Sequence, residues 1–255
     1  MGQARPYYAE KALSAAFYDT VTGADERLAG DLDIYFDLAP PGGSVLELGC
    51  GTGRLAFALA ERGLSVLGVD IAPAMLAQAS AKRADLEPSV AARVELRRGD
   101  MTAFDAKRIV DLVICPYFTL AHVPRGSAWK NTFATAARHL KAGGLAAFHL
   151  PREDIMRLPG PADPSLPVFD QPTSTGGRLQ LFIRERSYRE EVGRLDQVIE
   201  YVEFDAWGTV LRRSPERQTM YMADPTTVSG GSGLLLDRDP VPLGGVGDIW
   251  IFRKA

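Results

Sequence analysis

The chain has few cysteines, few histidines and little net charge. Its 255 residues include two cysteines, Cys50 and Cys115, and three histidines, and the formal net charge is −3. Two cysteines supply neither a disulfide framework nor the ligand spacing of a zinc site, so we expect two reduced, packed thiols and no bound metal. The small negative charge and the pI of about 5.7 argue against a partner recognised through phosphate groups, and so against nucleic acid.

Long apolar runs are also missing. No stretch approaches the length of a membrane span, and the N-terminal residues lack the apolar core of a signal peptide. We therefore expect a cytoplasmic protein without a membrane partner. The 46% of hydrophobic and 24% of charged residues are ordinary for a globular protein. The length suits one large α/β domain or one domain with a sizeable insertion.

Residues 44–53 predict a strand, a glycine turn and the start of a helix. They are Ser-Val-Leu-Glu-Leu-Gly-Cys-Gly-Thr-Gly, an apolar strand followed by glycine at every second position, Gly49, Gly51 and Gly53. Residues 54–62 then have helical composition and period. A ligand can approach such a turn closely, because glycine has no Cβ and the helix N-terminus offers unpaired N–H groups. The alternative is a turn that only packs the helix on the strand.

Two kinds of ligand compete for this turn. A dinucleotide fingerprint, G-x-G-x-x-G, would need glycine at the position of Arg54. The acid Glu47 would repel a pyrophosphate, whereas it would attract a ligand with ammonium and sulfonium groups. The stretch Glu47–Gly53 resembles the first motif of the class I S-adenosylmethionine-dependent methyltransferases, (Glu/Asp)-x-Gly-x-Gly-x-Gly. The resemblance implies that Glu47 and the turn, Cys50 included, bind S-adenosylmethionine.

A second strand, residues 65–70, ends in Asp70, which is suited to accept both ribose hydroxyls or, alternatively, to cap the next helix. The stretch from Asp70 to Leu76 resembles the family's Asp-x-Ser-x-x-Met-Leu. This likeness places Ile71 and Met75 near the adenosine, with a core position as the alternative for Met75.

A third strand, residues 93–98, is followed by Gly99-Asp100-Met101, which resembles the third signature of the family. The resemblance implies that Asp100 accepts the adenine amino group and that the Met101 backbone N–H donates to the ring. Either Met101 or Ile71 would then lie against the ring face. The alternative for Asp100 is an ordinary turn residue after a strand.

The fourth strand, residues 109–115, ends where acceptor and methyl group must meet. DNA and protein-glutamine methylases of this fold carry (Asn/Asp/Ser)-Pro-Pro-(Tyr/Phe) here, whereas this chain has Cys115-Pro-Tyr117-Phe. A thiol is a poor acceptor, which weakens the case for a nucleobase or amide substrate. We place Cys115 and Tyr117 beside the cofactor.

The three histidines receive different predictions. The run from Thr119 to Pro124 is similar to a stretch of small-molecule methyltransferases and makes His122 the candidate general base. The alternative is that His122 only ties its loop to a neighbour. His139 ends a predicted helix, residues 129–141, where a structural role is expected. His149, near the end of the predicted strand 145–150, is a candidate substrate contact, with a packed histidine as the alternative.

Residues 5–38 are aromatic and predicted to be helical. The pair Tyr18-Asp19 resembles the start of many small-molecule methyltransferases, in which an N-terminal helical lid covers the cofactor. Tyr18 is therefore interpreted either as a cofactor contact or as a core aromatic.

The C-terminal part predicts an insertion and then the end of the sheet. Residues 151–174 indicate an irregular loop, and segments 179–188, 194–204 and 210–214 alternate apolar and charged residues, which favours an antiparallel β-meander. In related methyltransferases such a meander caps the active site, and it supplies four candidate substrate contacts: Arg186, Tyr188, Tyr201 and Trp207. The alternative use is a homodimer interface. Residues 224–233 are not expected to form a helix.

These observations predict an α/β fold, a Rossmann-like doubly wound sheet of seven mostly parallel strands with an antiparallel cap inserted after the fifth. Residues 1–150 would form the lid and the cofactor-binding core, 151–222 the cap, and 223–255 the last strands. The resemblance implies methyl transfer from S-adenosylmethionine to N or O of a small-molecule acceptor by in-line displacement. The alternatives are a protein- or RNA-directed methyltransferase and a non-catalytic partner subunit that binds S-adenosylmethionine.

Overall fold

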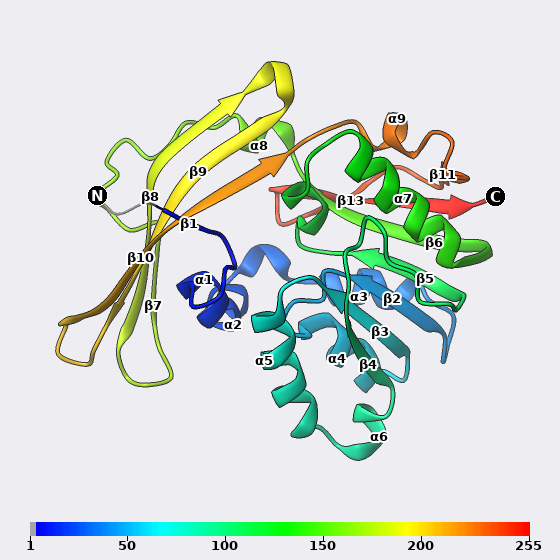
Figure 1. Ribbon diagram of the computed structural model, residues 1–255, viewed down its shortest axis with the longest axis horizontal. Helices are drawn as coiled ribbons and strands as arrows, with labels where there is room; N and C mark the ends of the chain where they lie inside the picture. The colour runs from blue at the N-terminus through cyan, green and yellow to red at the C-terminus, as the bar shows by residue number, and fades with distance from the viewer. Residues whose placement is uncertain (1–3) are drawn as a thin grey trace. The chain divides into compact units, whose positions relative to one another are not determined.

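A computed structural model describes residues 4–255 and divides the chain into two compact units (Figure 1). The core unit comprises Arg27–Arg152 and Met222–Ala255, and the cap unit comprises the residues up to Glu26 together with Glu153–Tyr221. The N-terminal segment, predicted to be a lid in one domain with the cofactor-binding core, groups with the inserted meander. None of the helices in residues 4–255 has the length and apolar character needed to cross a bilayer.

The core unit is built on a mostly parallel sheet. Its path is β11-β13-β6-β5-β2-β3-β4, and β12 also pairs with β13. The strands are β2 (Ser44–Leu48), β3 (Ser65–Asp70), β4 (Val94–Arg98), β5 (Val110–Cys115), β6 (Leu140–Pro151), β11 (Leu234–Leu236), β12 (Val241–Leu243) and β13 (Gly247–Lys254). Strands β2 to β6 run parallel, and β13 is antiparallel to β6. The predicted Rossmann-like sheet is confirmed, with one strand more than expected because β11 and β12 share the edge beside β13.

Helices cover the sheet through two separate apolar clusters. Their bounds are α3 (Asp31–Asp37), α4 (Arg54–Glu61), α5 (Pro73–Ala84), α6 (Pro88–Ala91), α7 (Ser127–His139) and α9 (Pro225–Ser229), with short 3-10 turns η1 (Glu26–Leu28) and η2 (Thr119–His122). Because side chains alternate along a strand, Val45 of β2 joins the cluster under α3 and α4, whereas Leu46 joins the cluster under α7. Each cluster therefore occupies one face of the sheet.

The cap unit is a five-stranded sheet in the order β1-β10-β9-β8-β7. Its elements are β1 (Arg5–Pro6), α1 (Leu13–Ala16), α2 (Tyr18–Gly23), α8 (Glu153–Met156), β7 (Phe169–Pro172), β8 (Arg178–Arg189), η3 (Glu190–Val192), β9 (Arg194–Phe204) and β10 (Val210–Tyr221). The predicted antiparallel meander is confirmed in β8, β9 and β10. The third strand continues to Tyr221, well past the segment that alternation had marked.

Two local predictions were wrong. Residues 224–233 contain helix α9, because Asp224 accepts a hydrogen bond from the Thr226 N–H at 2.9 Å and Pro225 fills the first helical position. A capping signal thus overrides the poor helix propensity of the segment. Residues 151–174, expected to be irregular, contribute α8 and strand β7.

The amino ends of the strands are tied by one carboxylate. Asp111, early in β5, accepts from the backbone N–H and the hydroxyl of Ser44 at 2.8 and 2.7 Å, and from Lys141 Nζ at 2.6 Å. Partial burial opposes ionisation, but the hydrogen bonds from Lys141 and Ser44 prevail and lower the pKa of Asp111 to about 2. Asp111 thereby joins the starts of β2, β5 and β6.

We expect Asp111→Asn to lower the free energy of unfolding by about 1–3 kcal/mol at pH 7, because it removes the ionised partner of three donors. A lowered carboxyl pKa stabilises the fold above its ordinary value of 3.8, and the gain is lost as pH falls through about 2. Urea unfolding at pH 7 and pH 3 should therefore show a smaller difference between wild type and variant at pH 3. Asp33 forms an exposed ion pair with Arg62, so Asp33→Asn is the control and should change the free energy of unfolding little. An equal difference in free energy of unfolding between wild type and Asp111→Asn at both pH values would contradict this role.

Candidate active site

The predicted cofactor motifs meet at the carboxyl edge of the sheet in the core unit. The Gly49 N–H donates to the Val69 carbonyl at 2.7 Å, and the Gly99 N–H donates to the Asp70 carbonyl at 3.0 Å. These bonds join the loops that follow β2 and β4 to the end of β3. The chain turns from one half of the sheet to the other between β2 and β5, and such switch points are where ligands bind in doubly wound sheets.

The glycine turn after β2 requires glycine for two reasons. Gly49, Gly51 and Gly53 have φ values of +76°, +54° and +87°, in the region that side chains disfavour. A Cβ on Gly49 would also lie 2.1 Å from Cγ2 of Thr119, and one on Gly53 would lie 2.4 Å from the Phe57 ring. The first of these contacts shows that the loop after β5 lies directly against the turn after β2.

Asp70 is held in place by two backbone donors. Its Oδ2 accepts from the Gly51 N–H and its Oδ1 from the Ala72 N–H, both at 2.8 Å. Burial raises the pKa of Asp70, and these two N–H groups act against the rise. Helix α5 has Ala72 at its N-cap position, and no side chain caps the helix there. Asp70, two residues before Ala72, accepts the Ala72 N–H instead. The carboxylate is therefore oriented before any ligand arrives.

Two apolar residues near Asp70 have different surroundings. Ile71 is 59% exposed, whereas Met75 is 3% exposed. An exposed isoleucine beside the ribose-binding candidate offers an apolar surface to a flat ring. Met75 has the buried position that was its alternative interpretation.

Glu47 is a buried acid under the turn. Its side chain is 2% exposed, and within residues 4–255 its Oε2 has no hydrogen-bond partner. Its pKa is raised to about 8, mainly by burial and in part by the carboxylates of Asp31 and Asp70, while Arg54 acts against the rise. A buried carboxyl with an unsatisfied oxygen is costly, so a cationic ligand group beside it would recover both charge and hydrogen bonding.

Arg54 and Asp31 form an ion pair that sequence reasoning missed. Arg54, the first residue of α4, donates from Nη1 to Asp31 Oδ1 at 3.0 Å and from Nη2 to Oδ2, and Asp31 is 2% exposed. The pair fastens α3 to the start of α4 and places a cation near Glu47. No spacing rule connects two residues this far apart in the sequence, so no signal was available to find it.

The loop after β4 carries the candidate adenine contacts. Asp100 is exposed, and its Oδ1 accepts from the backbone N–H and the hydroxyl of Thr102, both at 2.8 Å. This is the turn role that was the alternative for Asp100, and it fixes the carboxylate at the loop surface. Met101 is half-buried against the same apolar cluster as Phe104. A Cβ on Gly99 would lie 2.4 Å from Cδ2 of Phe104, so that ring sets the path of the loop.

The exit from β5 is a strained aromatic turn. Tyr117 and Phe118 have φ of +48° and +60°, and left-handed backbone of this kind at bulky residues concentrates at functional sites. The Thr119 hydroxyl donates to the Pro116 carbonyl at 2.7 Å. His122 closes η2 and is half-buried. Cys115, which precedes the turn, is fully buried in the apolar cluster, and burial raises the pKa of its thiol.

His149 lies behind this turn. It is 1% exposed, and its ring centroid is 4.4 Å from that of Phe118. Gly247 leaves room for the pair, since a Cβ there would lie 2.4 Å from Phe118 and 2.6 Å from His149 Nε2. The arrangement places His149 in the packed position that was its alternative.

The remaining candidate residues belong to the cap unit. Tyr201 is 1% exposed and shares a 2.9 Å hydrogen bond with the Tyr7 hydroxyl. Tyr188 donates to Glu153 Oε1 at 2.8 Å, and Trp207 is 88% exposed in the turn between β9 and β10. Tyr18 begins α2, with its ring edge-on to Tyr8.

Arg186 has a dense set of partners in the cap unit. It donates to the carbonyls of Leu158 and Ile155 at 2.9 and 3.0 Å, and to Gln197 Oε1 at 2.6 Å. These bonds attach α8 and the segment after it to the sheet. A substrate role for Arg186 would have to be compatible with this structural use.

Comparisons with known proteins bear on the core unit first. Residues 45–144 match the model of a family described as a methyltransferase domain. A cypemycin N-terminal methyltransferase of a Streptomyces species is 34% identical over 140 residues, 54% of each chain. A ubiquinone biosynthesis O-methyltransferase of Pseudomonas fluorescens is 34% identical over 107 residues, 42% of this chain and 44% of that one. The chain spans about half the length, or less, of the curated relatives it matches.

Solved structures of similar fold cover nearly the whole chain. DesVI of Streptomyces venezuelae has a TM-score of 0.74 at 16% identity, covering 94% of this chain and 98% of that one. CalS10 of Micromonospora echinaspora, an amino pentose methyltransferase, has a TM-score of 0.67 at 19% identity, with 95% and 96% covered. These structures share the fold of the chain, and residues 45–144 match a methyltransferase domain in sequence. The sequence-based assignment to the class I S-adenosylmethionine-dependent methyltransferases is confirmed for this part of the chain.

Glu47 should give the fold a measurable pH dependence. Its carboxyl pKa rises from 4.5 to about 8 on folding, so between these values the folded chain keeps a proton that the unfolded chain releases. Stability should then fall as pH rises from 4.5 to 8, by up to about 1.4 kcal/mol per unit. The side chain of the Glu47→Gln variant cannot ionise. The free energy of unfolding of this variant should therefore rise relative to that of wild type as pH increases across this window.

Denaturant unfolding at several pH values between 5 and 8 measures the change. Glu61→Gln, on the exposed side of α4, is the matched control and should run parallel to wild type. A Glu47→Gln curve that also runs parallel would show that Glu47 ionises in the folded chain as it does in water.

Proposed function

We propose that the protein is an enzyme that uses S-adenosylmethionine to methylate a nitrogen or oxygen atom of a small molecule. The observation that carries the proposal is the convergence of a left-handed glycine turn, an oriented Asp70 and a buried Glu47 at one edge of a methyltransferase fold. This donor set suits the cofactor, because the ligand carries two hydroxyls for one acid and positive charge for the other.

Each candidate residue has a chemical counterpart in the cofactor. Glu47, with its unsatisfied buried oxygen, suits the cationic amino acid end. Asp70 suits the ribose hydroxyls, and the loop from Gly99 to Met101 suits the adenine. Ile71, largely exposed, offers the ring an apolar contact. When bound, S-adenosylmethionine supplies a methyl group on a sulfonium, and the electron pair of the broken C–S bond passes to sulfur.

The chain's own contribution is positioning and, for a protonated acceptor, removal of a proton. The turn at Tyr117 and Phe118 lies beside the glycine turn through the Thr119 contact, so it would form a wall of the pocket in which a bound methyl donor meets its acceptor. His122 follows one turn later and is the candidate base that takes the acceptor proton. No metal is invoked.

Nitrogen and oxygen acceptors both occur among the relatives. The cypemycin relative acts at an N-terminus, and CalS10, a fold neighbour solved with S-adenosylmethionine, is an amino pentose methyltransferase. The ubiquinone relative is an O-methyltransferase, so hydroxyl acceptors belong in the same screen. Peptide and RNA acceptors should be included to test the broader alternatives.

Calorimetric titration with S-adenosylmethionine and S-adenosylhomocysteine tests the cofactor. We expect micromolar binding by wild type and at least a tenfold loss in Asp70→Asn, because a charged acceptor of hydrogen bonds becomes neutral. Asp33→Asn, an exposed acid on α3, is the matched control and should bind like wild type. A folded wild-type protein that binds neither ligand would refute the proposal, and binding without turnover of any acceptor would leave only a non-catalytic role.

His122→Gln tests the proposed base once an acceptor is known. We expect turnover to fall about a hundredfold or more for an acceptor bound in its protonated form, with the dissociation constant of S-adenosylmethionine unchanged. Steady-state kinetics together with calorimetry separate the two quantities. Unchanged turnover would remove His122 from the chemistry, and weakened cofactor binding would make it a loop anchor instead.

A further inference from the structure

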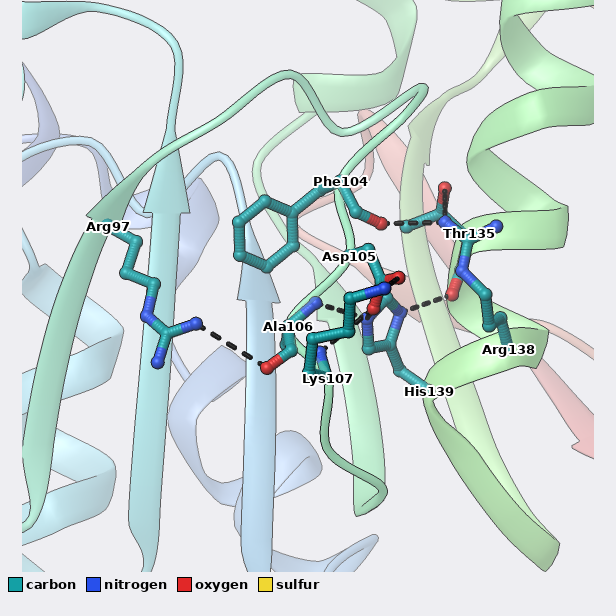
Figure 2. A network of polar contacts seen from close by, with 8 residues as sticks. All are labelled: Arg97, Phe104, Asp105, Ala106, Lys107, Thr135, Arg138 and His139. Atoms are coloured by element: carbon teal, nitrogen blue, oxygen red, sulfur yellow. Dashed lines mark hydrogen bonds and ion pairs between the residues drawn. The ribbon is translucent and has the colours of Figure 1, made fainter.

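His139 is buried between helix α7 and the loop after β4. It is 1% exposed, and both of its ring nitrogens have partners. Nδ1 lies 2.7 Å from the Thr135 carbonyl, and Nε2 lies 2.8 Å from the backbone nitrogen of Ala106 (Figure 2). A carbonyl can only accept and a backbone N–H can only donate, so Nδ1 carries the proton and Nε2 the lone pair. The ring is therefore neutral in this arrangement, whereas the sequence analysis had explained a structural His139 by positive charge.

Ala106 is held on both sides by this network. While its N–H donates to His139, its carbonyl accepts from Arg97 Nη1 at 3.4 Å (Figure 2). Arg97 comes from strand β4 and His139 from the last turn of α7. The peptide of Ala106 thus bridges a strand and a helix. Arg138 adds a bond from Nη2 to the Phe104 carbonyl at 2.6 Å.

Phe104 connects the anchored end of this loop, at Ala106, with its other end, at Gly99. The Phe104 ring is stacked on His139 with a centroid distance of 6.0 Å, and the same ring fills the space against Gly99. Gly99, Asp100 and Met101 carry the proposed adenine contacts. Residues 99–109 contain no helix or strand of their own, so these anchors, rather than regular structure, set their path.

We propose that His139 is a positioning residue for cofactor binding, which fixes the loop at Gly99–Met101 by accepting the Ala106 N–H. The inference rests on the proposed function, since it assigns the loop to the adenine end of the cofactor. His139 touches no reacting atom. Its effect is on the affinity for the cofactor and not on the chemical step.

A pair of substitutions separates the two nitrogens of His139. In His139→Gln the side-chain amide reaches the place of Nε2, so its oxygen can accept from Ala106. In His139→Asn the amide reaches only the place of Nδ1, so it can bond Thr135 but not Ala106. Both variants remove the ring, but the glutamine retains the bond to Ala106 and the asparagine retains the bond to Thr135.

We expect His139→Gln to keep the wild-type Michaelis constant for S-adenosylmethionine within about threefold, and His139→Asn to raise it about tenfold. The maximal rate should be unchanged in both. Equal Michaelis constants for the two variants would overturn the proposal, because loss of a merely structural ring would affect both variants to the same extent. Arg138→Gln, at an exposed position, removes the bond to Phe104 and should raise the constant several-fold. If His139→Asn does not fold and Arg138→Gln binds like wild type, the proposal is also overturned.

Amide hydrogen exchange without cofactor keeps this inference separate from the proposed function. Exchange at Ala106 should be slow in wild type and His139→Gln, and faster in His139→Asn or, if that variant does not fold, in His139→Phe, which cannot accept a hydrogen bond. Equal protection in the compared variants would refute the anchor even if the enzyme binds S-adenosylmethionine. Different protection in a protein that does not bind the cofactor would refute the proposed function and leave the anchor standing.

Discussion

The candidate site depends on one carboxylate that is bonded before any ligand binds. Asp70 uses one oxygen for the glycine turn and the other for the entry to α5, while its carbonyl receives the N–H of Gly99. Three loops from three neighbouring strands are thus tied to a single residue. Because hydrogen bonds to a charged acceptor are among the stronger ones in proteins, the loops share one fixed reference point. The chain's own hydrogen bonds therefore fix the geometry that a ligand would meet.

Glu47 imposes a second constraint, which is electrostatic. It is buried close enough to Asp31 and Asp70 to be affected by both, and Arg54 is the cation that offsets them. With Glu47 protonated, the carboxylates of Asp31 and Asp70 still outnumber the single arginine, so the region is short of positive charge. A cationic ligand would supply it, so recognition and charge balance coincide. The same shortage disfavours phosphate-bearing ligands, in agreement with the absence of glycine at position 54.

The sequence predicted those parts of the molecule that local patterns govern. Strands β2 to β6, the glycine turn and the placement of Asp70 and Gly99 at strand ends all follow from short motifs and periodicity. The partners of Arg54 and His139 did not, because Asp31 and Ala106 lie more than twenty residues away along the chain. Helix α9 was missed for a different reason. Its Asp-Pro start is a capping signal, which an argument from the poor helix propensity of the segment does not take into account.

The two edges of the core sheet differ in how well their polar groups are satisfied. At the amino ends, Asp111 is matched by Ser44 and Lys141. At the carboxyl ends, Glu47 keeps a buried oxygen without a partner in residues 4–255, and two aromatic residues in succession have left-handed backbone. Such costs persist in a fold when the rest of the structure outweighs them. The stability supplied at one edge thus allows the other to remain poised for a ligand, and the network of His139 keeps the loop after β4 in place.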